Sequence, residues 1–235
     1  MKKAILFTLI VMALLPSACA VLPDVITETR EVRNFDRVTF SASGELSITQ
    51  GEQESLTIGA LRDAMPRIET EVSGGTLYIR FREGLLPTVP QVGIVYNLTM
   101  REIGGLHLSG AGSLQASSIE TDDLEVVLSG AGGVAISSLT AETLEVGLTG
   151  TGAVELAGQV GEQDVTISGA GGYRAGELES QRATVNSSGV GGATVWATDT
   201  LDVTISGVGS VEYYGSPSVT QNISGVGSLT SLGDR

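Results

Sequence analysis

The sequence predicts an all-β fold, a single-stranded parallel β-helix (solenoid) with coils of about 18–22 residues. Three observations predict it. A unit of the form Ser/Thr-Gly-small-Gly returns seven times, apolar and polar residues alternate before each unit, and the chain has 32 glycines but only 4 % aromatic residues. Such a composition favours thin layers of small residues over a helical or sandwich core.

The repeat sets the architecture, because its period is that of a solenoid. Successive units lie 18 to 20 residues apart. A leucine-rich repeat of similar period would need a helix and a recurring Asn, and the units have neither. Their glycines predict a corner at which a Cβ would obstruct the turn and the approach of adjacent coils. The units begin at Ser109, Ser129, Thr149, Ser168, Ser188, Ser206 and Ser224.

A strand is expected before each unit and a second, shorter strand after it. The residue just before the unit and the residue three before it are apolar, except for Ser187 and Gln221, and the residue between them is mostly polar. This alternation indicates a strand with one buried face. Short strands of this kind bury their apolar face by stacking coil on coil, which places equivalent residues about 4.8 Å apart in columns.

The domain organisation follows from these patterns. We expect an export signal over 1–19, a short linker over 20–29 and the β-helix over 30–235, with looser coils over 30–100 and regular coils over 101–235. Ser43-Gly44 has the same strand-turn-strand context as the later units, and the 66 residues from Ser43 to Ser109 leave room for about three coils. The turn-rich segment 82–91 is the expected long loop.

The first residues have the pattern of an export signal. Lys2 and Lys3 precede an apolar run over 4–15, which is shorter than the ~20 residues that a membrane span needs. Two cleavage sites compete: one after Ala20, and one before Cys19 in a segment similar to a bacterial lipobox, from which Pro16 departs. We favour lipidation at Cys19, because it is the only cysteine of an exported chain.

Charge restricts the partners. Both lysines lie in the signal, so the remaining chain has 11 arginines against 27 acidic residues, a net charge of −16. Nucleic acid is therefore disfavoured as a partner, because phosphate binding needs basic density. The expected partners are the membrane, through the lipid anchor, and a cell-surface glycan or protein, with self-association as a further option. No disulfide, cofactor or metal is expected.

Two groups of residues are candidate sites. Glu125, Glu145, Asp164 and Asp202 fall in one outward column, interrupted by Thr184, where carboxylates could bind calcium or act as acid and base. A solvated face that opposes aggregation explains the column better. The single histidine, His107, lacks partners for a hydrolase or metal site.

The second candidate is aromatic. Trp196 and Tyr214 each lie eight residues after their unit's Ser, so they should stack in adjacent coils, with Tyr213 nearby. Rings on neighbouring coils are typical of a sugar-binding platform. The alternative explanation is packing under the C-terminal end of the solenoid.

The chain resembles a known family. "FDRVTFSASGELSITQG" (35–51), "MPRIETEVSGGTLYIRF" (65–81) and the train of "SGAG" units are similar to the putative auto-transporter adhesin head GIN domain family. The resemblance implies a right-handed β-helix in the bacterial cell envelope without established biochemical activity.

We therefore expect an exported scaffold or adhesin-like binding protein with no catalytic site. It would be lipid-anchored in the outer membrane or at the cell surface, or otherwise periplasmic or secreted. Two alternatives stay open. One is a carbohydrate-active lyase or hydrolase that uses the acidic column, and the other is an envelope protein that assembles end to end.

Overall fold

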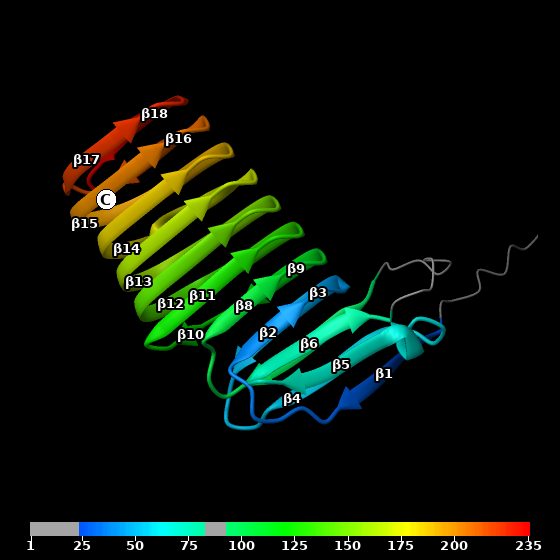
Figure 1. Cartoon of the computed structure of the whole chain (residues 1–235). Coiled ribbons are helices and arrows are strands. Elements are labelled where there is room, and N and C mark those ends of the chain that lie inside the picture. Colours follow the sequence, from blue (N-terminus) through cyan, green and yellow to red (C-terminus); the bar gives the residue numbers. More distant parts are fainter. Residues whose placement is uncertain (1–23, 83–92) are drawn as a thin grey trace, which may run out of the picture.

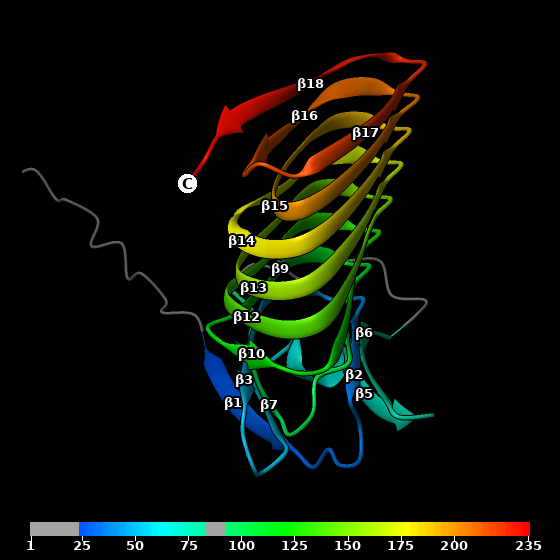
Figure 2. The same ribbon diagram turned by 90° about the vertical axis from the view of Figure 1, so that its left-hand side faces the viewer.

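The computed structural model describes residues 24–82 and 93–235. The predicted export signal with Cys19, and almost all of the expected long loop, lie outside the described residues. The described strands form one continuous sheet that winds into stacked coils (Figures 1 and 2). The strands are β1 (Val25–Arg30), β2 (Arg37–Phe40), β3 (Ser43–Gln50), β4 (Ser55–Leu61), β5 (Ile68–Ser73), β6 (Thr76–Phe81), β7 (Val95–Met100), β8 (Gly105–Leu108), β9 (Ala111–Ala116), β10 (Ile119–Glu120), β11 (Asp123–Leu128), β12 (Ala131–Leu148), β13 (Thr151–Ile167), β14 (Ala170–Ser187), β15 (Val190–Ile205), β16 (Val208–Tyr214), β17 (Ser218–Ile223) and β18 (Val226–Gly233).

The coils from β8 onward stack as parallel strands in register. Residues of β11 pair with β12, β12 with β13, β13 with β14 and β14 with β15, so that units 18 to 20 residues apart lie side by side. The predicted parallel β-solenoid is confirmed. Figure 2 shows the coils one above another, from the N-terminal strands to β17 and β18 at the other end.

The core consists of columns of equivalent side chains inside the coils. The two columns before each corner are buried from the first coil to the coil that ends at Ile205. Complete burial of a Leu, Val or Ile side chain contributes about 1.5–3 kcal/mol, so each coil adds several such increments. Gln221 departs from its apolar column because it lies in the last described coil, where the column is exposed to solvent. The two columns are Leu106, Val126, Val146, Val165, Val185 and Val203, and Leu108, Leu128, Leu148, Ile167, Ser187 and Ile205.

A buried polar network crosses one coil of this core. Gln163 lies in register with Leu144 of the preceding coil and Ala183 of the following coil, and its side chain is fully buried. The Tyr173 hydroxyl donates to Gln163 Oε1 at 2.9 Å, and Gln163 Nε2 donates to Ser180 Oγ at 2.8 Å. Ser180 Oγ donates in turn to the Trp196 carbonyl at 2.7 Å. Every member has a partner, which a buried polar group needs in order not to destabilise the core.

The N-terminal section does not consist of stacked coils throughout, so the expectation of looser coils over 30–100 is wrong in part. β6 and β7 pair parallel with β2 and β3, as in a coil, but the other pairings within this section are antiparallel. β1 pairs antiparallel with β4, β4 with β7, and β5 with β6. The β5–β6 hairpin turns through Gly74 and Gly75, both with positive φ (59° and 78°). A two-residue turn of this kind reverses the chain between β5 and β6, and β6 then runs parallel to β2. The linker expected over 20–29 also ends early, because β1 begins at Val25.

The first regular coil rests directly on β2 and β3, without the three coils expected between Ser43 and Ser109. Ser43 pairs with Ala111 and Gly44 with Gly112, so Ser41, not Ser43, occupies the corner equivalent to Ser109. The hydroxyl oxygens of Ser41 and Ser109 lie 2.7 Å apart. The intervening chain forms β4 to β7 at the N-terminal end, where β6 and β7 pair parallel with β2 and β3 on the side opposite to β8 and β9 (Figure 1).

The corners explain the glycines. The Ala131 amide donates to the Gly110 carbonyl, and the Thr151 amide donates to the Gly130 carbonyl, in a ladder that continues to Val226. A Cβ on Gly130 would collide with the carbonyl oxygen of Gly110 in the preceding coil. The second glycine of the unit can need a special backbone conformation as well, since Gly152 has φ +148°.

We predict that Gly130→Ala lowers the free energy of unfolding by about 1–3 kcal/mol, because the coils must separate locally to admit the methyl group. Equilibrium urea denaturation measures the change. Gly147→Ala is the control, since its Cβ would lie 3.7 Å from Val127 Cγ2, an ordinary contact. Equal changes in the two variants would show that the corner does not require glycine.

Candidate functional site

The acidic residues predicted in one column do share one. Glu125 pairs in register with Glu145, Glu145 with Asp164, and Asp164 with Thr184, which precedes Asp202. Their side chains point outward, because the residues that alternate with them are buried. Within residues 24–82 and 93–235, no group of three or more His, Cys, Asp or Glu residues could hold a metal ion. The column is therefore a row of separate carboxylates.

Arg37 neutralises the first carboxylate of the column. Arg37 and Glu125 both pair with Gly105, from opposite sides, and the Arg37 side chain extends over this glycine. Its Nη1 lies 2.5 Å from Glu125 Oε2. A Cβ at position 105 would lie only 3.0 Å from Arg37 Cγ, so the glycine makes room for the ion pair.

His107 joins this pair. Its Nε2 lies 3.2 Å from the same oxygen of Glu125, close enough for an ion pair when the histidine is protonated but not aligned for a hydrogen bond. Burial opposes ionisation of the Glu125 carboxyl, but Arg37 and His107 outweigh burial and hold the pKa of Glu125 below its usual value of 4.5. Glu125 is thus a fixed, paired anion and not a proton donor at neutral pH.

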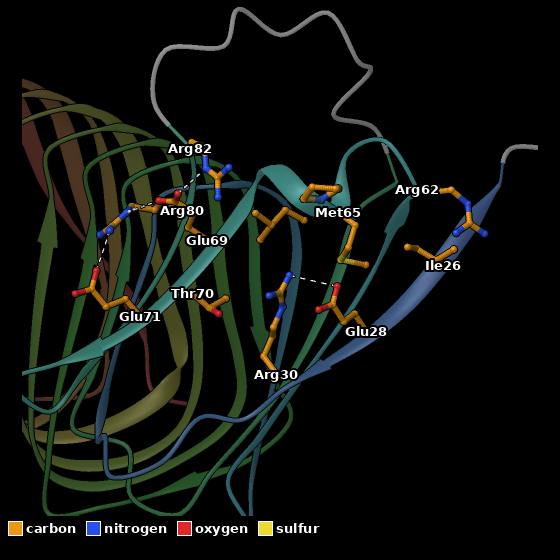
Figure 3. A pocket seen from close by; sticks show the side chains of 12 residues that line it. Ile26, Glu28, Arg30, Arg62, Met65, Glu69, Thr70, Glu71, Arg80 and Arg82 are labelled. Carbon is orange, nitrogen blue, oxygen red and sulfur yellow. Dashed lines mark hydrogen bonds and ion pairs between the residues drawn. The ribbon is translucent and has the colours of Figure 1, made fainter.

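A groove at the N-terminal end has a different character (Figure 3). It lies between β1 and β5, has a volume of about 740 Å³, and has Met65 and Ile68 among its apolar lining residues. Its charged side chains pair with one another. Arg80 Nη2 lies 2.8 Å from Glu71 Oε2, Arg82 Nε lies 2.8 Å from Glu69 Oε1, and Arg30 Nη2 lies 3.3 Å from Glu28 Oε2. Arg62, the fourth arginine of the lining, pairs with Asp24 outside it, with Nε 2.6 Å from Oδ2, so every charged side chain that lines the groove has a partner of opposite charge.

The aromatic residues separate into two groups. Trp196 pairs in register with Tyr214, as expected from their spacing, and both rings are half-buried on the outer face. Tyr213 pairs with Val195, which is fully buried, so Tyr213 continues an inward column and packs against the core. Tyr213 therefore lies beneath the proposed ligand surface and not on it.

Arg235 lies over the aromatic pair. Its guanidinium carbon is 5.1 Å from the centre of the Tyr214 ring and 6.0 Å from that of Trp196, within the range of a cation–π contact. Its Nη2 lies 2.8 Å from Glu177 Oε1, and its Nη1 donates to the Gly176 carbonyl. The sequence reasoning missed Arg235, because nothing in the repeat pattern indicates where the chain turns after β18.

A groove of about 540 Å³ lies beside the pair. Its lining includes Tyr214, Arg235 and the column Glu155, Arg174 and Thr194. Gly176 lies in a bulge of β14, where a Cβ would be only 3.1 Å from Tyr214 Cε2, so the glycine lets the ring lie against the strand. The groove combines an aromatic wall with paired carboxylates and guanidinium groups.

Comparison with known proteins agrees with the fold. A family model described as putative auto-transporter adhesin, head GIN domain, matches residues 34–217. The chain belongs to this family. No curated protein matches the chain. The family resemblance seen in the sequence is thereby confirmed.

Solved structures share the fold over most of the chain. A putative adhesin from Bacteroides fragilis is 27% identical, with a TM-score of 0.86, and the match covers 88% of this chain and 97% of that one. A putative adhesin from Parabacteroides merdae is 19% identical, with a TM-score of 0.70 and coverage of 89% and 96%. A putative lipid binding protein from Parabacteroides distasonis is 23% identical, with a TM-score of 0.65 and coverage of 89% and 97%. The last two support the fold alone.

We predict that Glu125→Gln lowers the free energy of unfolding at pH 7 by about 0.2–1 kcal/mol, as expected for a partly exposed ion pair. Because its pKa is lowered in the fold, Glu125 contributes its full stabilisation above its usual value of 4.5, and the contribution is lost as the pH falls through the lowered value. Urea denaturation between pH 7 and about pH 3 should show the variant and the native chain converging. Glu145→Gln is the control, because Glu145 makes no ion pair in the described structure. A difference that persists at the acid end would contradict this assignment.

Proposed function

We propose that this protein is an exported, non-catalytic, adhesin-like binding protein of the bacterial envelope, and that the groove beside Trp196 and Tyr214 is its ligand surface. The observation that supports this proposal is the pairing of two outward aromatic residues, Trp196 and Tyr214, of which Tyr214 lines a groove with hydrogen-bonding side chains. Membership of an adhesin-named family is consistent with it.

A cell-surface glycan fits the chemistry of the groove. A sugar ring has an apolar C–H face that packs on an aromatic ring, and hydroxyls that hydrogen-bond to carboxylates and guanidinium groups. Tyr214 supplies the ring, while Glu155 and Arg174, which form an ion pair, supply acceptors and donors in the same groove. Arg235 covers part of both rings, so a sugar that stacks on them must first displace its guanidinium.

Catalysis by the acidic column is less well supported than ligand binding at the aromatic groove. Glu125 is paired with Arg37 and approached by His107, the only histidine, while Glu145 and Asp164 are exposed. General acid–base catalysis needs a group whose pKa lies near the working pH, and the lowered pKa of Glu125 moves away from that range. We therefore propose binding without catalysis.

Attachment to the envelope would come from the segment before β1. In this proposal Cys19 carries the lipid, and β1 begins six residues later at Val25, so the N-terminal end of the solenoid lies near the membrane and the aromatic groove lies at the far end. No helix among the described residues is long and apolar enough to span a bilayer. A lipid on Cys19 would thus provide the attachment.

We predict that Trp196→Ala weakens glycan binding by about tenfold or more while lowering the free energy of unfolding by less than the ~3–5 kcal/mol that a fully buried aromatic loses. A glycan array and a thermal melt on the same variant measure both. Tyr78→Ala removes a half-buried tyrosine of β6 in the N-terminal section and serves as the control. A loss of stability in the buried-aromatic range, with no change in binding, would remove the ligand-site proposal and leave a structural role.

We predict that Cys19→Ser abolishes fatty-acid labelling and moves the protein from the membrane fraction to the soluble fraction, because the thiol is the site of lipid attachment. Metabolic labelling with a fatty acid and cell fractionation test this. Mass spectrometry that shows a native mature chain beginning at Val21 would refute the lipid anchor, while the groove proposal would still stand.

A further inference from the structure

The two ends of the solenoid differ in the edges that they present. At the N-terminal end the edge strands are β1 and β5, and both carry charged side chains. Glu28 pairs with Arg30 on β1. On β5, Glu71 pairs with Arg80 of β6 and Glu69 pairs with Arg82, which follows β6 (Figure 3). Charges along an edge oppose pairing with another strand, because a new neighbour would have to bury them.

The last described coil, residues 218–233, has no such protection. β17 pairs only with β15, and β18 only with β16, among the described strands (Figures 1 and 2). The segment contains no Asp, Glu, Lys, Arg or Pro. Its inward positions are uncovered, with Val219 and Ile223 each 38% exposed although the equivalent residues one coil earlier, Leu201 and Ile205, are fully buried.

We propose that this coil is a self-association surface, at which two copies of the chain join through antiparallel pairing of β17 and β18 about a two-fold axis. A two-fold axis across the end of the solenoid reverses strand direction, so β17 meets its own copy antiparallel and β18 does the same. Both open edges then gain hydrogen-bond partners at once. The uncovered apolar positions of one copy pack on those of the other.

A second copy in this orientation fits the charge distribution better than a head-to-tail stack. The chain carries a net charge of −14, so two copies repel unless they meet where charge is absent, as it is over 218–233. Stacking the coil on β1 or β5 of another copy would bury the glutamates and arginines of those edges. The two-fold contact therefore closes at a dimer, and it does not depend on the proposed ligand or on the lipid anchor.

The dimer would place the two aromatic grooves, each next to β16 and Arg235, at the centre of the assembly. Two binding grooves side by side would raise the apparent affinity for a repeating ligand.

Sedimentation velocity on the lipid-free Cys19→Ser protein tests the proposal. We expect a monomer–dimer equilibrium without larger species. Gln221→Lys together with Ile223→Lys should weaken the dimer by about tenfold or more, because two inward-facing charges would be buried at the contact. Thr166→Lys together with Thr204→Lys, which adds the same charge at exposed positions of interior coils, should leave the dimer unchanged. A chain that stays monomeric, or a dimer that the edge lysines do not weaken, overturns the proposal.

Disulfide trapping provides a second test that does not depend on the lysine variants folding. Since Cys19 is the only cysteine, Cys19→Ser with Asn222→Cys carries one thiol on β17, and mild oxidation should link two copies. Cys19→Ser with Thr204→Cys places the thiol one coil earlier in the same column and should stay unlinked. Equal linking of the two variants would show that the contact is elsewhere.

Discussion

The structure depends on one constraint, the close parallel pairing of each coil with the coil before it at the glycine corner. There the Leu108 carbonyl accepts from the amides of both Ser129 and Gly130, and the pattern repeats along the chain. The distance that these bonds impose leaves no room for a Cβ at Gly130 or its equivalents. Corner glycines, small intervening residues and a nearly fixed coil length all follow from this requirement.

The same constraint makes the outer face regular, so distinct chemistry arises where the ladder is interrupted. Gly105 removes one side chain from the acidic column, and Arg37 fills the space to reach Glu125. The bulge of β14 at Gly176 lets Tyr214 lie against the strand beneath Arg235. At the last described coil, β17 and β18 each pair with only one other described strand. Each candidate for function is a departure from the repeat.

The structure could be predicted from the sequence alone where the repeat is strict. The solenoid, its corners, the acidic column and the register of Trp196 with Tyr214 could all be predicted, because parallel stacking converts a fixed period directly into contact. The N-terminal section could not be read in this way. The Gly74-Gly75 turn is a hairpin signal in the sequence. The antiparallel pairing of β4 with β1 and β7, however, joins segments that are far apart in the sequence.

The same limit holds for the residues of the candidate site: those within the strict repeat could be predicted from the sequence, and those outside it could not. Tyr213 and Tyr214 are neighbours in sequence, but Tyr213 points inward from β16 and Tyr214 points outward. The alternation of side chains along a strand could have predicted this difference. Arg37 and Arg235 could not be placed from the sequence. Both lie outside the strict repeat, and each reaches a residue 58 or more positions away in the chain.

Hydrogen exchange at the corner amides tests the central constraint most directly. The amides of Ala131, Thr151 and Ala170 each donate to a glycine carbonyl of the preceding coil. If close pairing at the corner holds the coils together, these amides should exchange only through large-scale opening, with protection that approaches the global free energy of unfolding. Exchange of these three amides as fast as that of an exposed turn such as Gly74, while the strand amides stay protected, would contradict the account.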